Sequence, residues 1–132
     1  MITVLVSGGF DPLNIFHVRM FKEAKAMGDK LIVLLNNDYW LMKKNGEVLV
    51  PENERKELIE SFKWVDQVIF TTHTVESTDL SVCTEIEMIR PDIFANGGNK
   101  NKKDLPEFEI CDKLGVMIAD YVGDKRGGLN EN

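Results

Sequence analysis

The chain has 132 residues, a net charge of −6 and a hydrophobic fraction of 43%, which suits one globular domain. Its acidic balance argues against a general nucleic-acid-binding protein, because no basic stripe is present to neutralise phosphates. No apolar run is long enough to cross a bilayer, and Met1 leads into a strand pattern rather than a secretion signal. The two cysteines suit small buried side chains in a reducing cytosol. We therefore expect one cytoplasmic domain over residues 1–132, with an irregular tail at 120–132.

Apolar runs typical of buried strands alternate along the chain with segments of helical period. The expected strands are residues 2–6, 31–35, 68–70, 92–95 and 116–119. The expected helices are residues 15–27, a short helix within 39–50, 51–63, one that opens at 79–81 and stops at Pro91, and 103–114. In the first helix, an apolar stripe of Phe16, Met20, Ala24 and Met27 is expected to face the core. Strict alternation with short connections predicts an α/β fold, a Rossmann-like three-layer sandwich with a five-stranded parallel sheet.

Polar and glycine residues follow each expected strand, where α/β sheets bind their ligands. After the first strand, Gly8-Gly9 would let the backbone approach a ligand and adopt positive φ. The helix that follows offers unpaired N–H groups and a positive dipole end, which suits phosphate. The pattern is neither a dinucleotide fingerprint, because the third glycine is missing, nor a P-loop, because no Gly-Lys-Ser/Thr follows.

The segment Gly-Gly-Phe-Asp-Pro-Leu at 8–13, with His17 six residues after Asp11, resembles the first signature of the nucleotidylyltransferase superfamily, especially its cytidylyltransferase-like members typified by glycerol-3-phosphate cytidylyltransferases. Further blocks agree in order: Asn37-Asp38, Lys43-Lys44, Val50-Pro51, Glu54-Arg55, Val65-Asp66 and 94–98. The resemblance implies transfer of a nucleotidyl group (CMP or AMP) from CTP or ATP, with Mg²⁺, to a small phosphate or alcohol acceptor. It also implies release of pyrophosphate and a homodimer.

The resemblance also implies roles for particular residues. It assigns catalysis to Asn14, His17 and Lys44, and support of the site to Asp38 and Arg55. It assigns nucleotide binding to Gly8, Gly9, Phe10, Asp11, His17, Lys43, Asn96, Gly97, Gly98 and Asn99. No protein side chain is expected to bind a metal.

The chain departs from the family pattern at the start of the first helix. The family's His-x-Gly-His motif reads Asn14-Ile15-Phe16-His17 here. Asn donates a hydrogen bond but carries no charge, and losing one donor to developing charge can cost about 2.7–4 kcal/mol in the barrier. The ring of Phe16 stands where the family keeps space for the nucleotide. Two further departures are Asn99, where relatives have Asp, and Gly127-Gly128, where relatives have a Ser pair that opens a final helix.

Each of these residues also has a purely structural interpretation. Asn14 is a good helix N-cap, Phe16 fits the core stripe, and Asp11 suits capping of its turn. His17 could be an exposed polar residue, and Lys43-Lys44 a solvated pair. His73 is expected in a loop, with part of the site as the alternative. Trp40 and Trp64 are expected in the core or at an interface rather than as base-stacking platforms. Arg55 is expected to pair with a strand-end carboxylate such as Asp11.

Three hypotheses follow from these patterns. The first is an active nucleotidylyltransferase with altered motifs. The second is a catalytically inactive homologue that binds a nucleotide or a protein partner. The third is a purely structural or assembly role. Nucleotide binding separates the third from the other two, and pyrophosphate release separates the first from the second.

Overall fold

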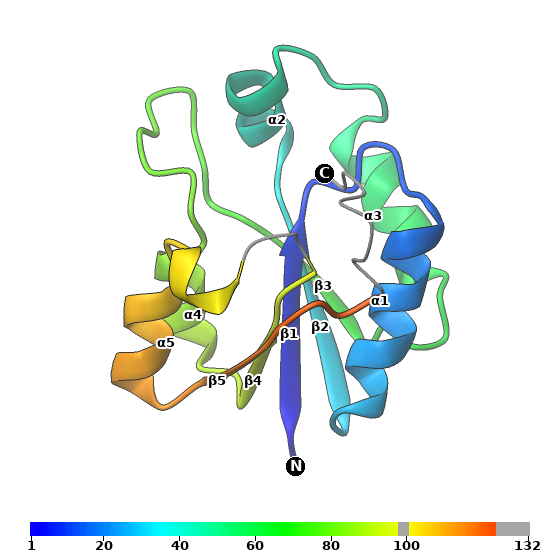
Figure 1. Ribbon diagram of the computed structural model, residues 1–132. Coiled ribbons are helices and arrows are strands. Elements are labelled where there is room, and N and C mark those ends of the chain that lie inside the picture. The colour runs from blue at the N-terminus through cyan, green and yellow to red at the C-terminus, as the bar shows by residue number, and fades with distance from the viewer. Residues whose placement is uncertain (98–100, 124–132) are drawn as a thin grey trace.

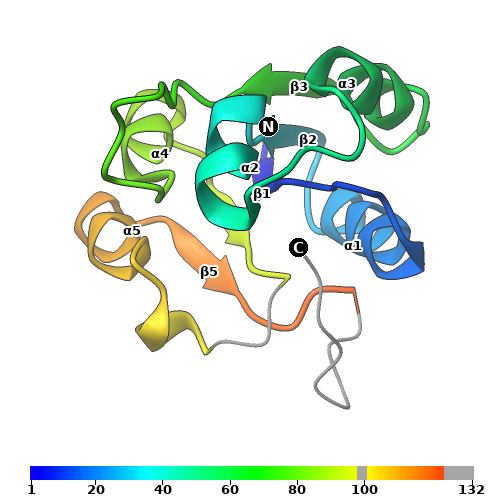
Figure 2. The ribbon, with the colours of Figure 1, turned by 90° about the horizontal axis from the view of Figure 1, so that it is seen from above.

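The sheet at the centre of the protein has five parallel strands in the order β3-β2-β1-β4-β5. We describe it from a computed structural model, which describes residues 1–97 and 101–123. The strands are β1 (Thr3–Gly8), β2 (Lys30–Leu35), β3 (Gln67–Phe70), β4 (Ile93–Ala95) and β5 (Met117–Ala119). Helices cover both faces, as Figures 1 and 2 show. The expected α/β sandwich with a five-stranded parallel sheet is confirmed.

The helices form two layers, with one additional helix above the sheet edge. They are α1 (Ile15–Ala26), α2 (Asp38–Asn45), α3 (Glu52–Glu60), α4 (Cys83–Ile89) and α5 (Phe108–Leu114), with a 3₁₀ turn at Lys102–Asp104. In Figure 2, α1 and α3 lie on one side of the sheet and α4 and α5 on the other, while α2 lies over the carboxyl ends of the strands. The order of the strands reverses between β1 and β4, so that edge is where a ligand is expected.

Two apolar cores fill the spaces between these layers. Successive side chains of a strand point to opposite faces, so Val4 and Val6 enter the α1–α3 core while Leu5 enters the α4–α5 core. The same alternation sends Val33 to the first core and Ile32 to the second. Both faces of the central strands are buried, which is why these strands are continuous apolar runs in the sequence.

The buried stripe of α1 differs from the expected one at its amino end. His17, Met20, Phe21 and Ala24 are the buried residues of this helix. Phe16 is only half-buried, and the guanidinium of Arg19 lies 5.5 Å from the centre of its ring. The prediction that Phe16 packs in the core is therefore wrong. The apolar period alone is compatible with either residue, and packing of α1 on the core buries His17.

Three expected helices are shorter than their sequence patterns suggested. The helix expected over 103–114 is divided because Pro106 disfavours helical backbone at the residue before it, and Leu105 is extended with ψ 139°. The helix expected over 51–63 ends at Glu60. The helix expected to open at 79–81 begins at Cys83, after a turn in which the Asp79 carboxylate accepts from the N–H of Ser81 at 2.9 Å.

Candidate active site

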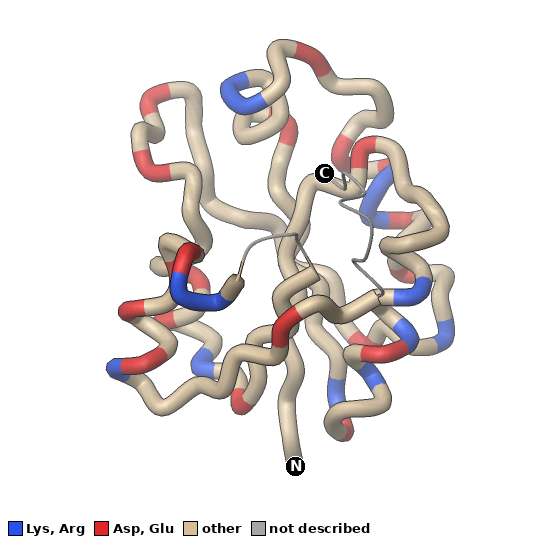
Figure 3. Tube along the Cα trace, viewed as in Figure 1, with Lys and Arg blue, Asp and Glu red and all other residues tan. Residues whose placement is uncertain are grey.

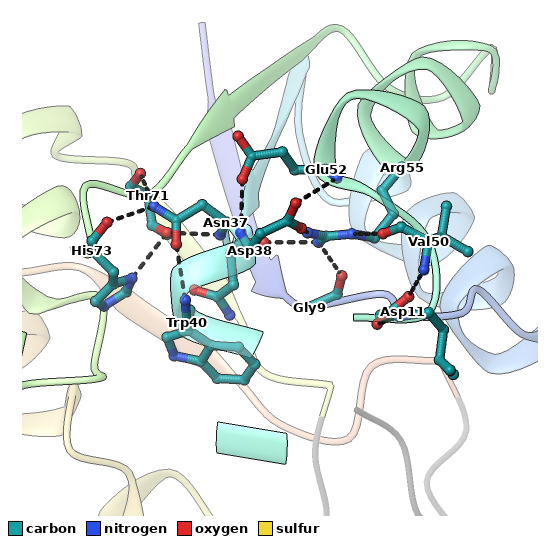
Figure 4. A network of polar contacts seen from close by, with 12 residues as sticks. Gly9, Asp11, Asn37, Asp38, Trp40, Val50, Glu52, Arg55, Thr71 and His73 are labelled. Carbon is teal, nitrogen blue, oxygen red and sulfur yellow. Dashed lines mark hydrogen bonds and ion pairs between the residues drawn. The ribbon is translucent and has the colours of Figure 1, made fainter. Parts of the chain in front are cut away.

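The carboxylate of Asp11 connects the turn that follows β1 to the segment before α3. This side chain is 4% exposed, and its two oxygens accept from the backbone N–H groups of Leu49 at 2.7 Å and Val50 at 2.6 Å. Figure 4 shows Asp11 facing this segment, which precedes α3. Asp11 therefore connects two chain segments that lie far apart in sequence. Asp11, the example named for a strand-end partner of Arg55, binds these two N–H groups instead.

The guanidinium of Arg55 is the centre of the polar network in Figure 4. Arg55 is fully buried, and its Nη1 donates to the carbonyl oxygens of Gly9 at 2.7 Å and Asn36 at 2.8 Å. Its Nε donates to the carbonyl of Val50 at 2.8 Å, and its Nη2 pairs with the Asp38 carboxylate at 2.6 Å. A strand-end carboxylate does bind Arg55 as expected, but it is the one that follows β2. The planar fork of arginine holds the ends of β1 and β2 and the start of α3 together.

The starts of α2 and α3 cap each other. The N–H of Asp38 donates to the Glu52 carboxylate at 2.7 Å, and the N–H of Glu52 donates to the Asp38 carboxylate at 3.3 Å. Both carboxylates therefore lie at helix N-termini, where the unpaired N–H groups and the helix dipole favour negative charge. Asp38 thus supports the site as expected, by orienting Arg55 and by placing α2 beside α3.

The two glycines at the end of β1, Gly8 and Gly9, allow neighbouring side chains to pack closely. A Cβ on Gly8 would lie 2.8 Å from the ring of Phe10, and one on Gly9 would lie 2.9 Å from the Leu41 side chain and 3.2 Å from that of Trp40. Positive φ was expected at this glycine pair, yet the residue with positive φ in this turn is Phe10, at 51°. The packing of Phe10 and α2 accounts for both glycines without a ligand, and a nucleotide contact here stays a prediction.

Asn14 is the N-cap of α1. Its side-chain oxygen accepts from the N–H groups of Phe16 at 2.9 Å and His17 at 3.2 Å. In return, the Asn14 N–H donates to Nδ1 of His17 at 3.1 Å, which completes a capping box. The capping interpretation of Asn14 is confirmed. Because the amide oxygen is used by the helix, the amide nitrogen is the group that Asn14 can offer to a ligand.

His17 lies beneath the same helix start. It is 3% exposed, and its ring meets the ring of Phe10 edge-on, with centroids 4.9 Å apart and planes at 89°. The interpretation of His17 as an exposed polar residue is therefore wrong. Since Nδ1 accepts a hydrogen bond from the backbone, the neutral ring carries its proton on Nε2. The backbone of Asn14 and the ring of Phe10 thus fix both the tautomer and the orientation of this imidazole.

The two lysines of α2 differ in their contacts. The ammonium of Lys43 donates to the carbonyl oxygens of Val75 at 3.1 Å and Ser77 at 2.7 Å, so it is engaged by the loop after β3. Lys44 is exposed at the end of the same helix. Phosphate contacts by Lys43 and catalysis by Lys44 stay predictions.

The same helix carries Trp40, which belongs to the fold. Its indole N–H donates to the carbonyl of Leu80 at 2.8 Å, and its ring covers Gly9. Trp64 is partly buried against the α1–α3 core and stacks on Phe62, with centroids 6.2 Å apart. Packing roles for both tryptophans agree with the structural interpretation.

The end of β4 packs against α1 across the point where the strand order reverses. The side chain of Asn96 donates to the Asp120 carboxylate at 3.1 Å, and its carbonyl accepts from Val122 N–H at 3.1 Å. A Cβ on Gly97 would clash with the sulfur of Met20, so this glycine permits close packing on α1. Gly98, Asn99, Gly127 and Gly128 lie outside the described residues, and their predicted roles are untested.

Two negative findings concern residues 1–97 and 101–123 only. Within these ranges, no group of three or more His, Cys, Asp and Glu side chains is placed to hold a metal ion. Within the same ranges, no helix has the length and apolarity that a membrane crossing requires.

The model of the family "Cytidylyltransferase-like" matches residues 5–109. An FAD synthase of Thermococcus kodakarensis is 33% identical over 114 residues, covering 86% of this chain and 68% of that protein. A bifunctional protein HldE of Desulfatibacillum aliphaticivorans is 29% identical over 88% of this chain. The ethanolamine-phosphate cytidylyltransferase of Mus musculus is 25% identical over 93% of this chain.

The chain covers a variable share of these relatives. It spans about two thirds of the FAD synthase, 23% of the HldE protein and 32% of the mouse enzyme. Among solved structures, a lipopolysaccharide core biosynthesis protein of Thermoplasma volcanium matches with a TM-score of 0.70 and 28% identity, covering 91% of this chain and 95% of that one. The family match extends over most of the chain, and the fold and the motif blocks agree with it. This chain belongs to the cytidylyltransferase-like family of nucleotidyltransferases.

Proposed function

We propose that the protein transfers a nucleotidyl group, CMP or AMP, from a nucleoside triphosphate to a small phosphate or alcohol acceptor and releases pyrophosphate. The observation that carries the proposal is the buried Arg55 network, which fixes the turn after β1 relative to the ends of β2 and α3. Phosphoryl chemistry depends on positioning and on preorganised charge. A network of this rigidity at the expected edge of the sheet meets the first requirement.

The start of α1 supplies the groups that would meet the phosphates. In this proposal the Nε2–H of His17 donates to a phosphate oxygen, because Nδ1 is committed to the Asn14 backbone. The amide nitrogen of Asn14 takes the place of the family's first histidine as a neutral donor. Lys43 and Lys44 are the motif lysines that could add charge, and Lys43 would first leave the carbonyls of Val75 and Ser77.

A requirement for Mg²⁺ is part of the proposal. The described residues contain no side-chain cluster suited to a metal. Mg²⁺ usually keeps several waters and takes further ligands from substrate phosphates rather than from a protein cage. The ion would thus arrive on the triphosphate, where it would neutralise part of the phosphate charge.

The proposal does not specify which nucleotide is the donor or which molecule is the acceptor. The names of the relatives specify a cytidylyl group and ethanolamine phosphate in one case and FAD in another. The end of β4, from Asn96 onward, is where part of the nucleotide contact is expected. Homodimer formation and a cytoplasmic location are also proposed on the basis of the family.

An inactive, nucleotide-binding homologue is the second candidate. Two observations favour it: the Asn14 oxygen is used by the helix cap, and Lys43 is held by the loop after β3. The ring of Phe16, half-buried beside Arg19, also stands where the family has glycine.

A pyrophosphate-release assay tests the two candidates. The natural protein is incubated with CTP or ATP, Mg²⁺ and an acceptor panel that includes ethanolamine phosphate and glycerol 3-phosphate. The double variant N14H/F16G, which restores the family motif, should raise the rate by about a hundredfold, because it returns a charged donor and opens space. K22H, which adds a histidine at an exposed position of the same helix, is the matched control and should leave the rate unchanged.

The outcomes separate the candidates. Release by the natural protein supports the enzyme. Saturable nucleotide binding without release, even in N14H/F16G, supports the inactive homologue. If neither the natural protein nor N14H/F16G binds a nucleotide or releases pyrophosphate, both candidate functions are contradicted.

A further inference from the structure

Polar side chains end all five strands on one face of the sheet, the face covered by α4 and α5. Every strand has an apolar side chain in the core beneath these helices, and the side chain two residues later lies on the same face. These later side chains form what we call the polar row: Thr71, Asn36, Ser7, Asn96 and Asp120, in the order of the strands. On the opposite face the corresponding positions are apolar or glycine: Phe70, Leu35, Gly8, Ala95 and Ala119.

The outer members of the polar row are bound within the protein. The hydroxyl of Thr71 accepts from the N–H of Asn37 at 3.2 Å. At the other end of the row, the Asn96 amide donates to the Asp120 carboxylate at 3.1 Å. The groups that remain for a ligand are therefore those at the centre of the row, on β2 and β1.

Asn36 carries an unsatisfied group at the centre of the row. The residue is 4% exposed, and its Oδ1 is buried without a hydrogen-bond partner among residues 1–97 and 101–123. The Nδ2 of the same amide has no partner in that part of the chain either, but it is not buried. The Asn36 backbone, in contrast, is bound, because its N–H donates to the Gly8 carbonyl at 2.9 Å and its carbonyl accepts from Arg55 at 2.8 Å. A buried amide oxygen without a donor destabilises the free protein, so the fold does not account for this side chain.

The neighbouring Asn37 is an asparagine that the fold does account for. Its Oδ1 accepts from the Trp40 N–H at 3.0 Å and caps α2. Its Nδ2 donates to the carbonyls of Thr71 at 3.2 Å and His73 at 2.8 Å. Both ends of the Asn37 amide are thus used in structure, whereas both ends of the Asn36 amide are left for another molecule.

Ser7 lies beside Asn36 in the polar row. Ser7 is opposite Leu34 in the ladder between β1 and β2, so Asn36 is its diagonal neighbour on the same face. Ser7 is half-buried, and its hydroxyl forms no hydrogen bond within the described part of the chain. In Figure 3 the ends of β1 and β2 carry no charge, and the first charged positions after them, Asp11 and Asp38, are acidic. A neutral polar group fits this position better than a phosphate, which needs a cation.

We propose that Asn36 and Ser7 select the acceptor by binding one of its uncharged hydroxyl groups. The proposal rests on the nucleotidyl transfer proposed above. The nucleotide is expected at β4, and β2 lies on the other side of β1, so the two substrates would lie side by side across β1. A hydroxyl both donates and accepts, so it can bind the Asn36 amide in either orientation and the Ser7 hydroxyl as well. The expected acceptor is a polyol phosphate. An ammonium group fits less well, because it would be buried beside neutral side chains.

Binding is measured without nucleotide, so that it does not depend on transfer. Glycerol 3-phosphate and ethanolamine phosphate, which carry hydroxyl groups and an ammonium group respectively, are titrated into ¹⁵N-labelled protein. The side-chain amide signals of Asn36, identified by their absence from the spectrum of N36A, are followed by NMR. We expect a saturable shift of these signals with glycerol 3-phosphate and roughly tenfold weaker binding of ethanolamine phosphate. No saturable shift, or equal binding of the two compounds, would overturn the proposal.

The pyrophosphate-release assay separates this inference from the proposed function. A saturable shift at Asn36 without pyrophosphate release supports acceptor binding and contradicts transfer. Release without any shift at Asn36 supports transfer and overturns the role of Asn36.

Alanine variants distinguish a binding role from a structural one. N36A and S7A should each weaken binding of glycerol 3-phosphate about tenfold, because a hydrogen bond to the ligand is lost. N36A should leave the urea midpoint of the free protein unchanged or raise it, since it removes an unsatisfied buried group. N37A should lower that midpoint, because it removes a helix cap and leaves two carbonyls without their donor. N45A, at the exposed end of α2, is the matched control for binding and should leave it unchanged.

Two results with these variants would overturn the proposal. One is a urea midpoint in N36A as low as that in N37A, which would make Asn36 a structural residue. The other is binding of glycerol 3-phosphate that is unchanged in both N36A and S7A, or weakened equally in N45A.

Discussion

Replacement of Arg55 by methionine tests whether the buried guanidinium holds the strand ends together. Methionine keeps the apolar length of the side chain and removes every donor. Two buried carbonyls, those of Gly9 and Asn36, lose their partner, as does the half-buried carbonyl of Val50. A buried acceptor without a partner costs about 1–3 kcal/mol. The Asp38 carboxylate is 36% exposed, so its loss of a charge partner adds little.

The variant R55M should therefore lower the free energy of unfolding by about 3–5 kcal/mol. Urea unfolding at pH 7, followed by tryptophan fluorescence, measures the difference. The neighbouring K56M is the matched control, because Lys56 forms an exposed pair with Glu60 at 3.6 Å and a contact with the Phe70 ring at 5.9 Å, both at the surface. It should change the stability by less than about 0.5 kcal/mol. A loss below about 1 kcal/mol in R55M, or one equal to that in K56M, would refute the role assigned to Arg55.

Three further predictions concern other parts of the molecule. D11A should cost about 3 kcal/mol, because two backbone N–H groups lose a charged acceptor, and urea unfolding measures it; a loss below about 1 kcal/mol contradicts the fastening role. Burial raises the pKa of the Cys111 thiol to about 11 and also raises that of the less buried Cys83. At pH 8, iodoacetamide should thus modify Cys83 first, as read by mass spectrometry, and equal rates would contradict this. The hydrogen bond from Lys25 holds the pKa of Asp66 below its ordinary value of 3.8, so its stabilisation should be present above that pH and lost as the pH falls through the folded-state pKa. D66N should be less stable than the natural protein at pH 7 but equally stable near pH 2, and a difference that persists in acid would contradict the assignment.

The sheet could be predicted from the sequence because its strands are buried on both faces. Runs such as 31–35 have no polar residue, so neither register nor face had to be known to recognise them. Their boundaries shifted by one or two residues, since ladder hydrogen bonds extend β1 to Gly8, beyond its last aliphatic side chain. The division of the helix before Phe108 could also have been read from Pro106, whose effect on the preceding residue is local.

The partners in the site could not be predicted from spacing. Asp11 and Asp38 both follow strands and both precede Arg55, so the sequence offered two equivalent carboxylates for one guanidinium. The path of the segment before α3 decided between them, because it brings the N–H groups of Leu49 and Val50 to Asp11. That path depends on tertiary packing, which sequence periodicity does not predict.

Two features of the site had only weak signals in the sequence. Glu52 suited the first turn of its helix through the dipole, but its reach to the Asp38 N–H required the structure. The burial of His17 rather than Phe16 is accompanied by the capping box, in which the Asn14 N–H donates to His17 Nδ1.

Calorimetric titration with CTP and ATP, each with Mg²⁺, tests the central claim most directly. The account predicts saturable binding of at least one nucleotide, with weaker binding in H17A because the fixed Nε2–H donor is lost. The variant K22A, at an exposed position of the same helix, should bind as the natural protein does. Absence of heat and of thermal stabilisation with both nucleotides would contradict nucleotide binding at this edge of the sheet, and with it the proposed transfer reaction.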